Sequence, residues 1–268
     1  MATGLADGIR LVATDLDGTL LSGGIKRVRP EAFPLIERVC DAGALFLAAS
    51  GRQYASLRRL FAPVADRIGY LCENGALVVW QGETLVRVVM PRDIALAVCH
   101  MAMDTPHCEF IASGERCAYV LSGNQPFYDH LTKVVGNDVE TVEKPEDIPE
   151  PLVKVAFQVR PEKNEEVRQD FERRFGDTCK VVTSGTEWID VLMNGVNKGS
   201  ALAVLGLVLA MPLADMAAFG DAENDREMLG AVGHPYLMDP CAPTMLDLAP
   251  RCQRSTSVEG ELEHLLAR

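Results

Sequence analysis

Short apolar runs alternate with stretches of helical periodicity over the first third of the chain. Residues 9–14 and 45–49 are brief and largely uncharged, which is the pattern of strands buried on both faces of a parallel sheet. Between these runs, Pro30 opens and Gly43 closes a segment with apolar residues at helical spacing. The alternation continues to about residue 79 and predicts a doubly wound parallel sheet of the α/β class.

The pattern changes between residues 88 and 193, where polar helical stretches such as 164–175 mix with β-rich pieces. These pieces are residues 116–121, 153–159, 180–183 and 187–193. Strand–helix alternation then resumes after Asn194-Gly195-Val196. The chain is therefore predicted to have a core formed by residues 1–87 and 194–268, with an inserted α+β domain formed by residues 88–193.

Composition and charge narrow the classes of partner. A chain of 268 residues, 48% of them hydrophobic, can bury one large core or two smaller ones. The net charge of −12 disfavours nucleic-acid binding, which needs a basic face. The longest apolar segment, residues 201–218, is interrupted by Gly206, Pro212 and Asp215, so it is not expected to span a membrane. An anionic substrate would need a local source of positive charge.

The cysteines and the leader predict a cytoplasmic protein. Eight cysteines are scattered without a Cys-x-x-Cys pair, which favours free thiols in a reducing compartment over a disulfide framework. The five histidines have no ligand-like spacing, so no zinc site is expected. The first eight residues have neither a basic start nor an apolar stretch, and no signal peptide is expected there.

Two carboxylates, Asp15 and Asp17, follow the first predicted strand, and Gly18 allows a sharp turn after them. In open α/β sheets, ligands bind at the carboxyl ends of the strands. A carboxylate pair at that edge can divide the roles of nucleophile and proton-transfer group between its members. An ordinary Asp-Gly turn is the alternative interpretation of this stretch taken alone.

Two further segments offer groups that suit a phosphate. Ser50-Gly51-Arg52 ends the second predicted strand just before a helical stretch, where a hydroxyl and a glycine amide can bind an anion. Lys198 lies at the start of an apolar helix. Either feature alone has an ordinary interpretation, because small residues fill many turns and a lone lysine is usually solvated surface.

Asp221 follows a further short strand, residues 216–219, and so reaches the same sheet edge as Asp15 and Asp17. Asn224 or Asp225 can cap the next helix, but capping does not explain Asp221. Converging carboxylates repel one another and raise their pKa values unless a cation lies among them. Ligands that are all oxygen favour a hard ion, and beside a phosphate that ion is usually Mg²⁺.

In this order, Asp15-x-Asp17-Gly-Thr, Ser50-Gly51, Lys198 and Gly220-Asp221-x-x-Asn224-Asp225 resemble the four motifs of the haloacid dehalogenase (HAD) superfamily. The wider pattern, including Glu73-Asn74-Gly75-Ala76 after the third strand, is similar to the Cof-type phosphatases of that superfamily, above all the bacterial sugar phosphatases. The similarity extends from about residue 9 to 266. It implies a Rossmann-like core, a cap inserted between the second and third motifs, Mg²⁺ as cofactor, and a small phosphorylated metabolite as substrate.

The resemblance also implies roles in phosphomonoester hydrolysis. Asp15 is the expected nucleophile, and Asp17 is the expected acid and base. Mg²⁺ is expected to bind Asp15, the backbone carbonyl of Asp17, and Asp221. The remaining phosphate oxygens are expected to bind the Ser50 hydroxyl, the Gly51 amide and Lys198.

Three residues keep more than one interpretation. Asn224 can orient the phosphate or a metal-bound water, and Asp225 can order Lys198 or the metal shell. Arg52 can reach the substrate or the cap, or form a surface salt bridge. One departure limits the resemblance, because Asp239-Pro240 stands where many relatives have Gly-Asn, so their substrate preference is not carried over.

Two alternative functions remain. A phosphomutase of the same superfamily would share every catalytic residue but return the phosphoryl group to the sugar. A receiver domain for phosphoaspartate signalling also combines acidic residues, Mg²⁺ and a lysine, but it is about half this length and does not need Asp17. Neither the physiological substrate nor the oligomeric state follows from the residues.

Overall fold

The computed structural model describes residues 5–184 and 186–267, and the chain divides into two compact units. The first unit combines Met1–Val86 with Asn197–Arg268, and the second is the continuous segment Arg87–Val196. The assignment of the second unit as a cap that selects the substrate stays a prediction. The first four residues of the leader lie outside the described residues.

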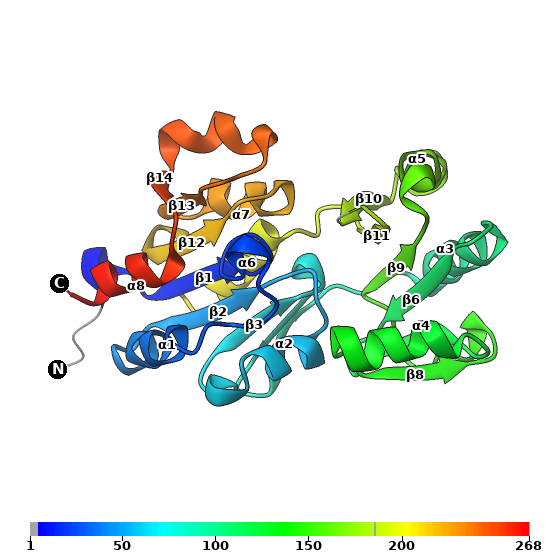
Figure 1. The fold of residues 1–268 in the computed structure, drawn as a ribbon, viewed down its shortest axis with the longest axis horizontal. Coiled ribbons are helices and arrows are strands. Elements are labelled where there is room, and N and C mark those ends of the chain that lie inside the picture. Colours follow the sequence, from blue (N-terminus) through cyan, green and yellow to red (C-terminus); the bar gives the residue numbers. More distant parts are fainter. Residues whose placement is uncertain (1–4, 185, 268) are drawn as a thin grey trace. The chain divides into compact units, whose positions relative to one another are not determined.

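The first unit is built on an eight-stranded sheet with the order β14-β13-β12-β1-β2-β3-β4-β5 (Figure 1). Neighbouring strands from β14 to β3 are parallel, whereas β3 and β4 are antiparallel. The strands are β1 (Leu11–Asp15), β2 (Leu45–Ala49), β3 (Gly69–Cys72), β4 (Leu77–Trp80), β5 (Glu83–Arg87), β12 (Met216–Gly220), β13 (His234–Met238) and β14 (Gln253–Ser255).

Helices cover both faces of this sheet. One hydrophobic cluster packs helices α1 (Ala32–Asp41), α2 (Tyr54–Leu60) and α8 (Val258–Leu266) on one face, and a second packs α6 (Lys198–Val208) and α7 (Arg226–Ala231) on the other. Successive side chains of a strand point to opposite faces, so Val12 of β1 joins the first cluster while Leu11 and Ala13 join the second. This double burial explains why β1 and β2 have no polar alternation.

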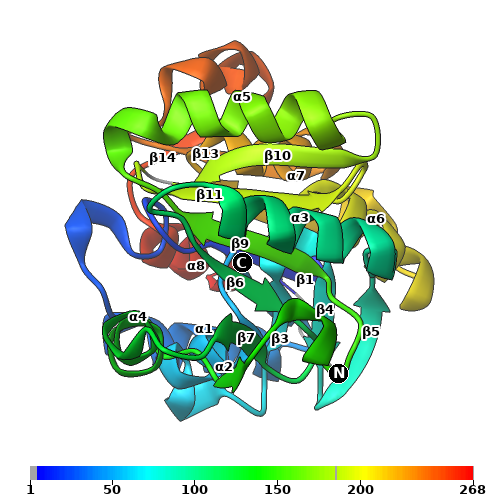
Figure 2. The same ribbon diagram turned by 90° about the vertical axis from the view of Figure 1, so that its right-hand side faces the viewer.

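The second unit has a six-stranded sheet with the order β10-β11-β9-β6-β7-β8, in which only the β7–β8 pair is parallel. Helices α3 and α5 pack on one face, which Figure 2 views from the helix side. Helix α4 packs on the opposite face. The elements are α3 (Arg92–Asp104), β6 (Glu109–Ser113), β7 (Ala118–Leu121), α4 (Gln125–Asp129), β8 (Val139–Val142), β9 (Lys154–Gln158), α5 (Asn164–Phe175), β10 (Cys179–Ser184) and β11 (Trp188–Met193).

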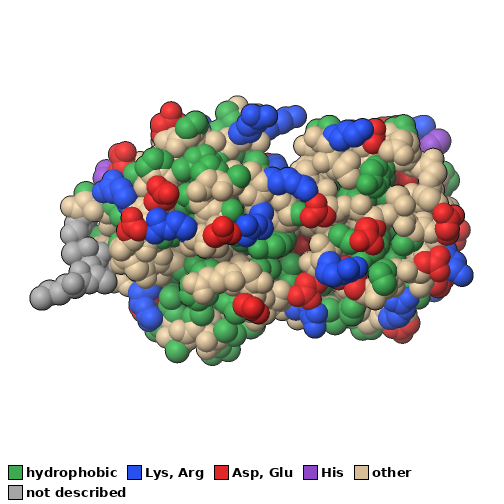
Figure 3. Space-filling model, turned by 90° about the horizontal axis from the view of Figure 1, so that it is seen from below, with side chains coloured by type: hydrophobic (Ala, Val, Ile, Leu, Met, Phe, Trp, Pro, Cys, Tyr) green, Lys and Arg blue, Asp and Glu red, His purple; other side chains and the backbone are tan. Residues whose placement is uncertain are grey.

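These two sheets confirm the predicted fold class, a doubly wound parallel core with an inserted α+β domain. Within the described part of the chain, no helix has the length and hydropathy needed to cross a membrane. On the face drawn in Figure 3, basic and acidic side chains are interspersed. Exposed ion pairs of the protein include Arg58 with Asp66 and Arg226 with Asp247.

Cys99 and Cys108 are expected to resist alkylation at pH 8 in the folded protein. Both are free thiols, and burial raises the pKa of each to about 12. An unfolded cysteine has a pKa near 8.5, so folding lowers the fraction of reactive thiolate by about three orders of magnitude. Iodoacetamide labelling followed by peptide mass spectrometry measures the difference, with urea-unfolded protein as the control.

The same pKa shifts predict a loss of stability at alkaline pH. The folded state favours the neutral thiols, so their contribution is fully present below the pKa of the unfolded thiols and is lost as pH rises above about 9. The urea midpoint should therefore fall between pH 8 and pH 10, and by less in Cys99→Ala. Equal labelling of folded and unfolded protein would contradict the burial of these thiols.

Candidate active site

Three neighbouring parallel strands bring the predicted residues to one edge of the core sheet. Asp15 is the last residue of β1 and is in register with Ala49 at the end of β2, after which Ser50 follows. On the other side of β1, Asp221 follows the last residue of β12. The motifs after β1, β2 and β12 therefore meet at the carboxyl edge, where ligands bind in sheets of this kind.

Lys198 is the first residue of α6 and is completely buried. Its Nζ donates hydrogen bonds to Oδ1 of Asp15, at 2.5 Å, and to Oδ1 of Asp225, at 2.6 Å. The helix begins at Lys198 because Asn197 and Ser200 form a capping box. The side chain of Asn197 accepts from the amide of Ser200, and the hydroxyl of Ser200 accepts from the amide of Asn197. The ordinary interpretation of Lys198 as solvated surface is therefore wrong.

Burial and neighbouring charges shift the pKa values of Asp15, Lys198 and Asp221. Burial, and next the negative charge of Asp225, raise the pKa of Asp15 to about 8, although Lys198 opposes both effects. Burial disfavours the charged form of Lys198, but the charges of Asp15 and Asp225 outweigh it and hold the pKa of Lys198 above its usual value. Burial also raises the pKa of Asp221. One ammonium group does not balance these carboxylates at neutral pH.

Asp221 is held close to the loop that follows β1. Thr19 Oγ1 donates to Asp221 Oδ1 at 2.7 Å. Gly18 has a φ of +98°, and a Cβ at this position would overlap the Asp221 carboxylate. A glycine is thus needed both for the left-handed turn and for the close approach of Asp221.

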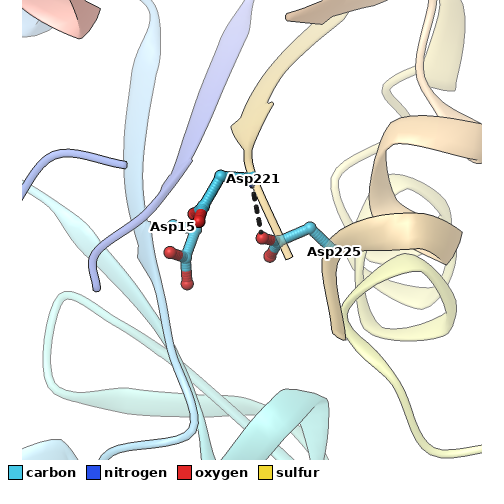
Figure 4. A group of neighbouring side chains, drawn as sticks. All are labelled: Asp15, Asp221 and Asp225. Carbon is cyan, nitrogen blue, oxygen red and sulfur yellow. Dashed lines mark hydrogen bonds between the residues drawn. The ribbon is translucent and has the colours of Figure 1, made fainter. Parts of the chain in front are cut away.

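The carboxylates of Asp15, Asp221 and Asp225 form a group suited to a divalent cation. One oxygen from each lies within 4.8 Å of the others, and Figure 4 shows the side chain of Asp15, at the end of β1, beside those of Asp221 and Asp225 from the segment after β12. Asp225 Oδ1 accepts from Lys198, and Oδ2 accepts from the amides of Asp221 and Ala222 at 3.1 and 3.2 Å. Since both oxygens of Asp225 are engaged, Asp15 and Asp221 are the carboxylates that could hold the ion, and an all-oxygen set fits Mg²⁺.

Asp17 differs in environment from Asp15. Its side chain is 60% exposed, and it forms a bidentate ion pair with Arg52, whose Nε and Nη2 lie 3.0 and 2.6 Å from the two oxygens. The carboxylate of Asp17 is therefore outside the acidic group, whose third member is Asp225. Of the interpretations given to Arg52, an ion pair is the one present, but with the predicted acid–base residue as the partner.

The predicted phosphate-binding residues lie around the same edge. Ser50 is buried, and its Oγ accepts from the amide of Arg52 at 3.2 Å. Asn224 Nδ2 lies 3.5 Å from Oδ1 of Asn74, a residue to which the sequence motifs assign no role. The signal for Asn74 was the Asn-Gly dipeptide directly after the third strand, which by itself indicates only a turn.

The departure at Asp239-Pro240 lies in the loop after β13. Asp239 forms an ion pair with Arg254, and the peptide bond before Pro240 is cis. The same loop reaches the fourth motif, because the amide of Ala242 donates to the carbonyl of Asp221 at 2.8 Å.

The chain is similar to known hydrolases and phosphatases over most of its length. Residues 12–260 match the family described as haloacid dehalogenase-like hydrolase. The chain is 32% identical over 263 residues to an HMP-PP phosphatase of Serratia proteamaculans, covering 91% of this chain and 89% of that protein. It is 27% identical over 255 residues to the 5-amino-6-(5-phospho-D-ribitylamino)uracil phosphatase YbjI of Escherichia coli, covering 95% and 94%.

Solved structures show the same fold. A crystal structure from Eubacterium rectale has a TM-score of 0.82 at 27% identity, over 97% of this chain and 98% of that one. The HAD subclass IIB sugar phosphatase BT4131 has a TM-score of 0.77 at 20% identity, over 95% and 98%.

Proposed function

Because this chain belongs to the haloacid dehalogenase-like hydrolases as a Cof-type phosphatase, we propose that it hydrolyses small phosphomonoesters, sugar phosphates among them, with Mg²⁺ and through a phosphoaspartate on Asp15. The observation that carries this mechanism is the buried contact of Asp15 with Lys198 at the edge where the four motifs meet.

Asp15 is positioned to act as a nucleophile. Lys198 holds one carboxylate oxygen of Asp15 and so limits rotation of the side chain. The other carboxylate oxygen can then point at the phosphorus atom. Attack by this oxygen on phosphorus forms the acyl phosphate and releases the alcohol, provided that Asp15 is ionised. When bound between Asp15, Asp221 and the Asp17 carbonyl, Mg²⁺ would supply the positive charge that keeps Asp15 ionised and neutralises the phosphate.

Asp17 serves as acid and base in this proposal. Its exposure lets it reach the leaving oxygen, donate a proton to it, and then accept a proton from the water that hydrolyses the acyl phosphate. Arg52 limits the rotation of Asp17 through two parallel hydrogen bonds. Arg52 is therefore assigned to orienting Asp17.

The phosphate is held by donors from three segments. The Ser50 hydroxyl and Gly51 amide come from the loop after β2, Lys198 from the start of α6, and Asn224 from the loop after β12. Charge spreads over the equatorial phosphate oxygens during transfer, and donors fixed before the reaction stabilise it most. Asp225 keeps Lys198 in place.

The relatives support small metabolites as the substrate class. One is named for a phosphorylated ribitylamino-uracil and the other for HMP-PP, so both act on small phosphorylated compounds. Buried free thiols such as Cys99, Cys117 and Cys179 favour a reducing compartment and thus the cytoplasm.

Phosphate release from a panel of small phosphate esters tests the proposal. The panel contains hexose, pentose and polyol phosphates, with p-nitrophenyl phosphate as a general substrate. We expect release that depends on Mg²⁺ and is lost with EDTA, because the acidic group needs a cation to keep Asp15 ionised. Added Mg²⁺ should restore it. A folded protein that binds Mg²⁺ but releases phosphate from no compound would overturn the proposal, and conversion of one sugar phosphate isomer to another would indicate a mutase.

A further inference from the structure

The turn after β3, Glu73–Gly75, has an unusual backbone for three successive residues. Glu73, Asn74 and Gly75 have φ values of +51°, +56° and +102°. Residues other than glycine rarely adopt a positive φ, and this backbone conformation persists only where the surrounding structure enforces it. All three residues are buried. The Glu73–Gly75 turn is therefore held in place by its neighbours, and each neighbour belongs to a different part of the proposed site.

The first neighbour is the phosphate-binding loop after β2. The amide of Asn74 donates to the carbonyl of Ser50 at 3.1 Å, and the amide of Glu73 donates to the carbonyl of Arg52 at 3.2 Å. The side-chain amide of Asn74 also lies against Gly51, where a Cβ would come 2.9 Å from Oδ1 and 3.1 Å from Nδ2. Gly51 is thus enclosed on its Cα side by Asn74.

The other neighbours are the segments that carry the third and fourth motifs. Asn224 Nδ2 lies 3.5 Å from Oδ1 of Asn74. A Cβ on Gly75 would overlap the carbonyl of Asn197, the residue that caps α6 and so places Lys198. The Glu73–Gly75 turn therefore lies between the segments that carry Gly51, Lys198 and Asn224.

We infer that Asn74 is a positioning residue for phosphate binding. This inference rests on the proposed function. Asn74 fixes the distance between the Gly51 amide and Asn224, so that donors from separate loops converge on one phosphate. It does so from a backbone conformation that asparagine tolerates better than most residues. Asn74 needs no contact with the phosphate itself, and it is not one of the three carboxylates, Asp15, Asp221 and Asp225, that form the acidic group.

Replacement by glycine separates positioning from folding. Glycine adopts a φ of +56° more easily than asparagine, so the thermal midpoint of Asn74→Gly should stay equal or rise. The affinity for inorganic phosphate in the presence of Mg²⁺, measured by calorimetry, should nevertheless fall at least about tenfold, because Gly51 and Asn224 lose the side chain between them. The affinity for Mg²⁺ should change by less than about twofold.

Gln81→Gly is the matched control. Gln81 also has a positive φ, +53°, but it is exposed in the turn between β4 and β5. Its replacement should leave the affinity for phosphate unchanged. Asn74→Asp provides a second test if the glycine variant does not fold, since it keeps the size and Oδ1 of asparagine but replaces the amide donor by a charged oxygen. It too should bind phosphate at least about tenfold more weakly.

A folded Asn74→Gly variant that binds phosphate as tightly as the unaltered protein would overturn the inference, as would equal affinity in Asn74→Asp. The proposed function fails in a different way, if the unaltered protein binds phosphate but hydrolyses no ester. A purely structural role for Asn74 predicts a lower thermal midpoint with unchanged affinity in the folded protein.

Discussion

Asp15→Asn is expected to lower phosphatase activity by at least about 10⁴-fold, which corresponds to about 5 kcal/mol of lost transition-state stabilisation. The amide cannot form the acyl phosphate, and no other carboxylate takes the position of Asp15 at the end of β1. Asp17 is held by Arg52, and both oxygens of Asp225 are engaged. Steady-state phosphate release with a saturating ester and Mg²⁺ measures the loss.

The fold is expected to survive this change. Asparagine has the size of aspartate, and it replaces a carboxylate whose charged form is disfavoured by burial, which raises the pKa of Asp15 to about 8. Asp66→Asn, at a side chain that is 88% exposed, is the control and should retain full activity. Activity in Asp15→Asn would contradict the nucleophile assignment, once mass spectrometry had excluded deamidation back to aspartate.

Lys198→Met is expected to reduce both stability and activity. Methionine fills a similar volume but leaves Asp15 and Asp225 buried without their shared cation. Removing one partner of a buried ion pair costs about 3–5 kcal/mol. Activity should fall by about 10²- to 10³-fold or more, since the phosphate loses a charged donor. Urea unfolding measures the loss of stability, and phosphate release by the folded fraction measures the loss of activity.

A compensating change makes this prediction specific. Adding Asp225→Asn to Lys198→Met removes a buried carboxylate that has lost its cation, so the double variant should be more stable than Lys198→Met alone while staying inactive. Lys133→Met is the control, because Lys133 is 71% exposed and pairs with Asp129 on the surface. It should leave both quantities nearly unchanged. Equal stability of Lys198→Met and the unaltered protein would show that the buried pair does not hold the core together.

The sequence predicted the fold well where strands are buried on both faces. The runs that became β1 and β2 are short and apolar, and no other element suits that pattern. It predicted less in the inserted domain. Strand β6 was missed although it lies between β9 and β7. Its ends are Glu109 and Ser113, so only three apolar positions remain. Phe110 and Ala112 are buried in the cluster that contains α3, and Ile111 is buried on the opposite face.

Within the candidate site, residue order predicted which loops meet, but not how their side chains pair. Asp15 and Asp17 are two positions apart, yet one is buried against Lys198 and the other is exposed against Arg52. Asp15 is the last residue of β1, whereas Asp17 lies in the turn after the strand, and no periodicity encodes this difference. Lys198 alone resembled a surface residue, because its burial depends on partners 183 and 27 positions away. The role proposed for Asn74 likewise depends on contacts with two distant segments, which carry Gly51 and Asn224.

The first unit is interrupted in the chain by the whole of the second, and this has a consequence for synthesis on the ribosome. When residue 196 emerges, all of the inserted unit is present, but β12, β13, β14 and α6 to α8 are not. Strand β1 then lacks its β12 neighbour, and Asp15 has no Lys198. Translation proceeds at about 5–20 residues per second, so the remaining 72 residues expose an unfinished apolar edge for several seconds. The second unit, which is continuous in the chain, can therefore fold first. Until the first unit is complete, its exposed apolar edge is the surface that a chaperone would protect.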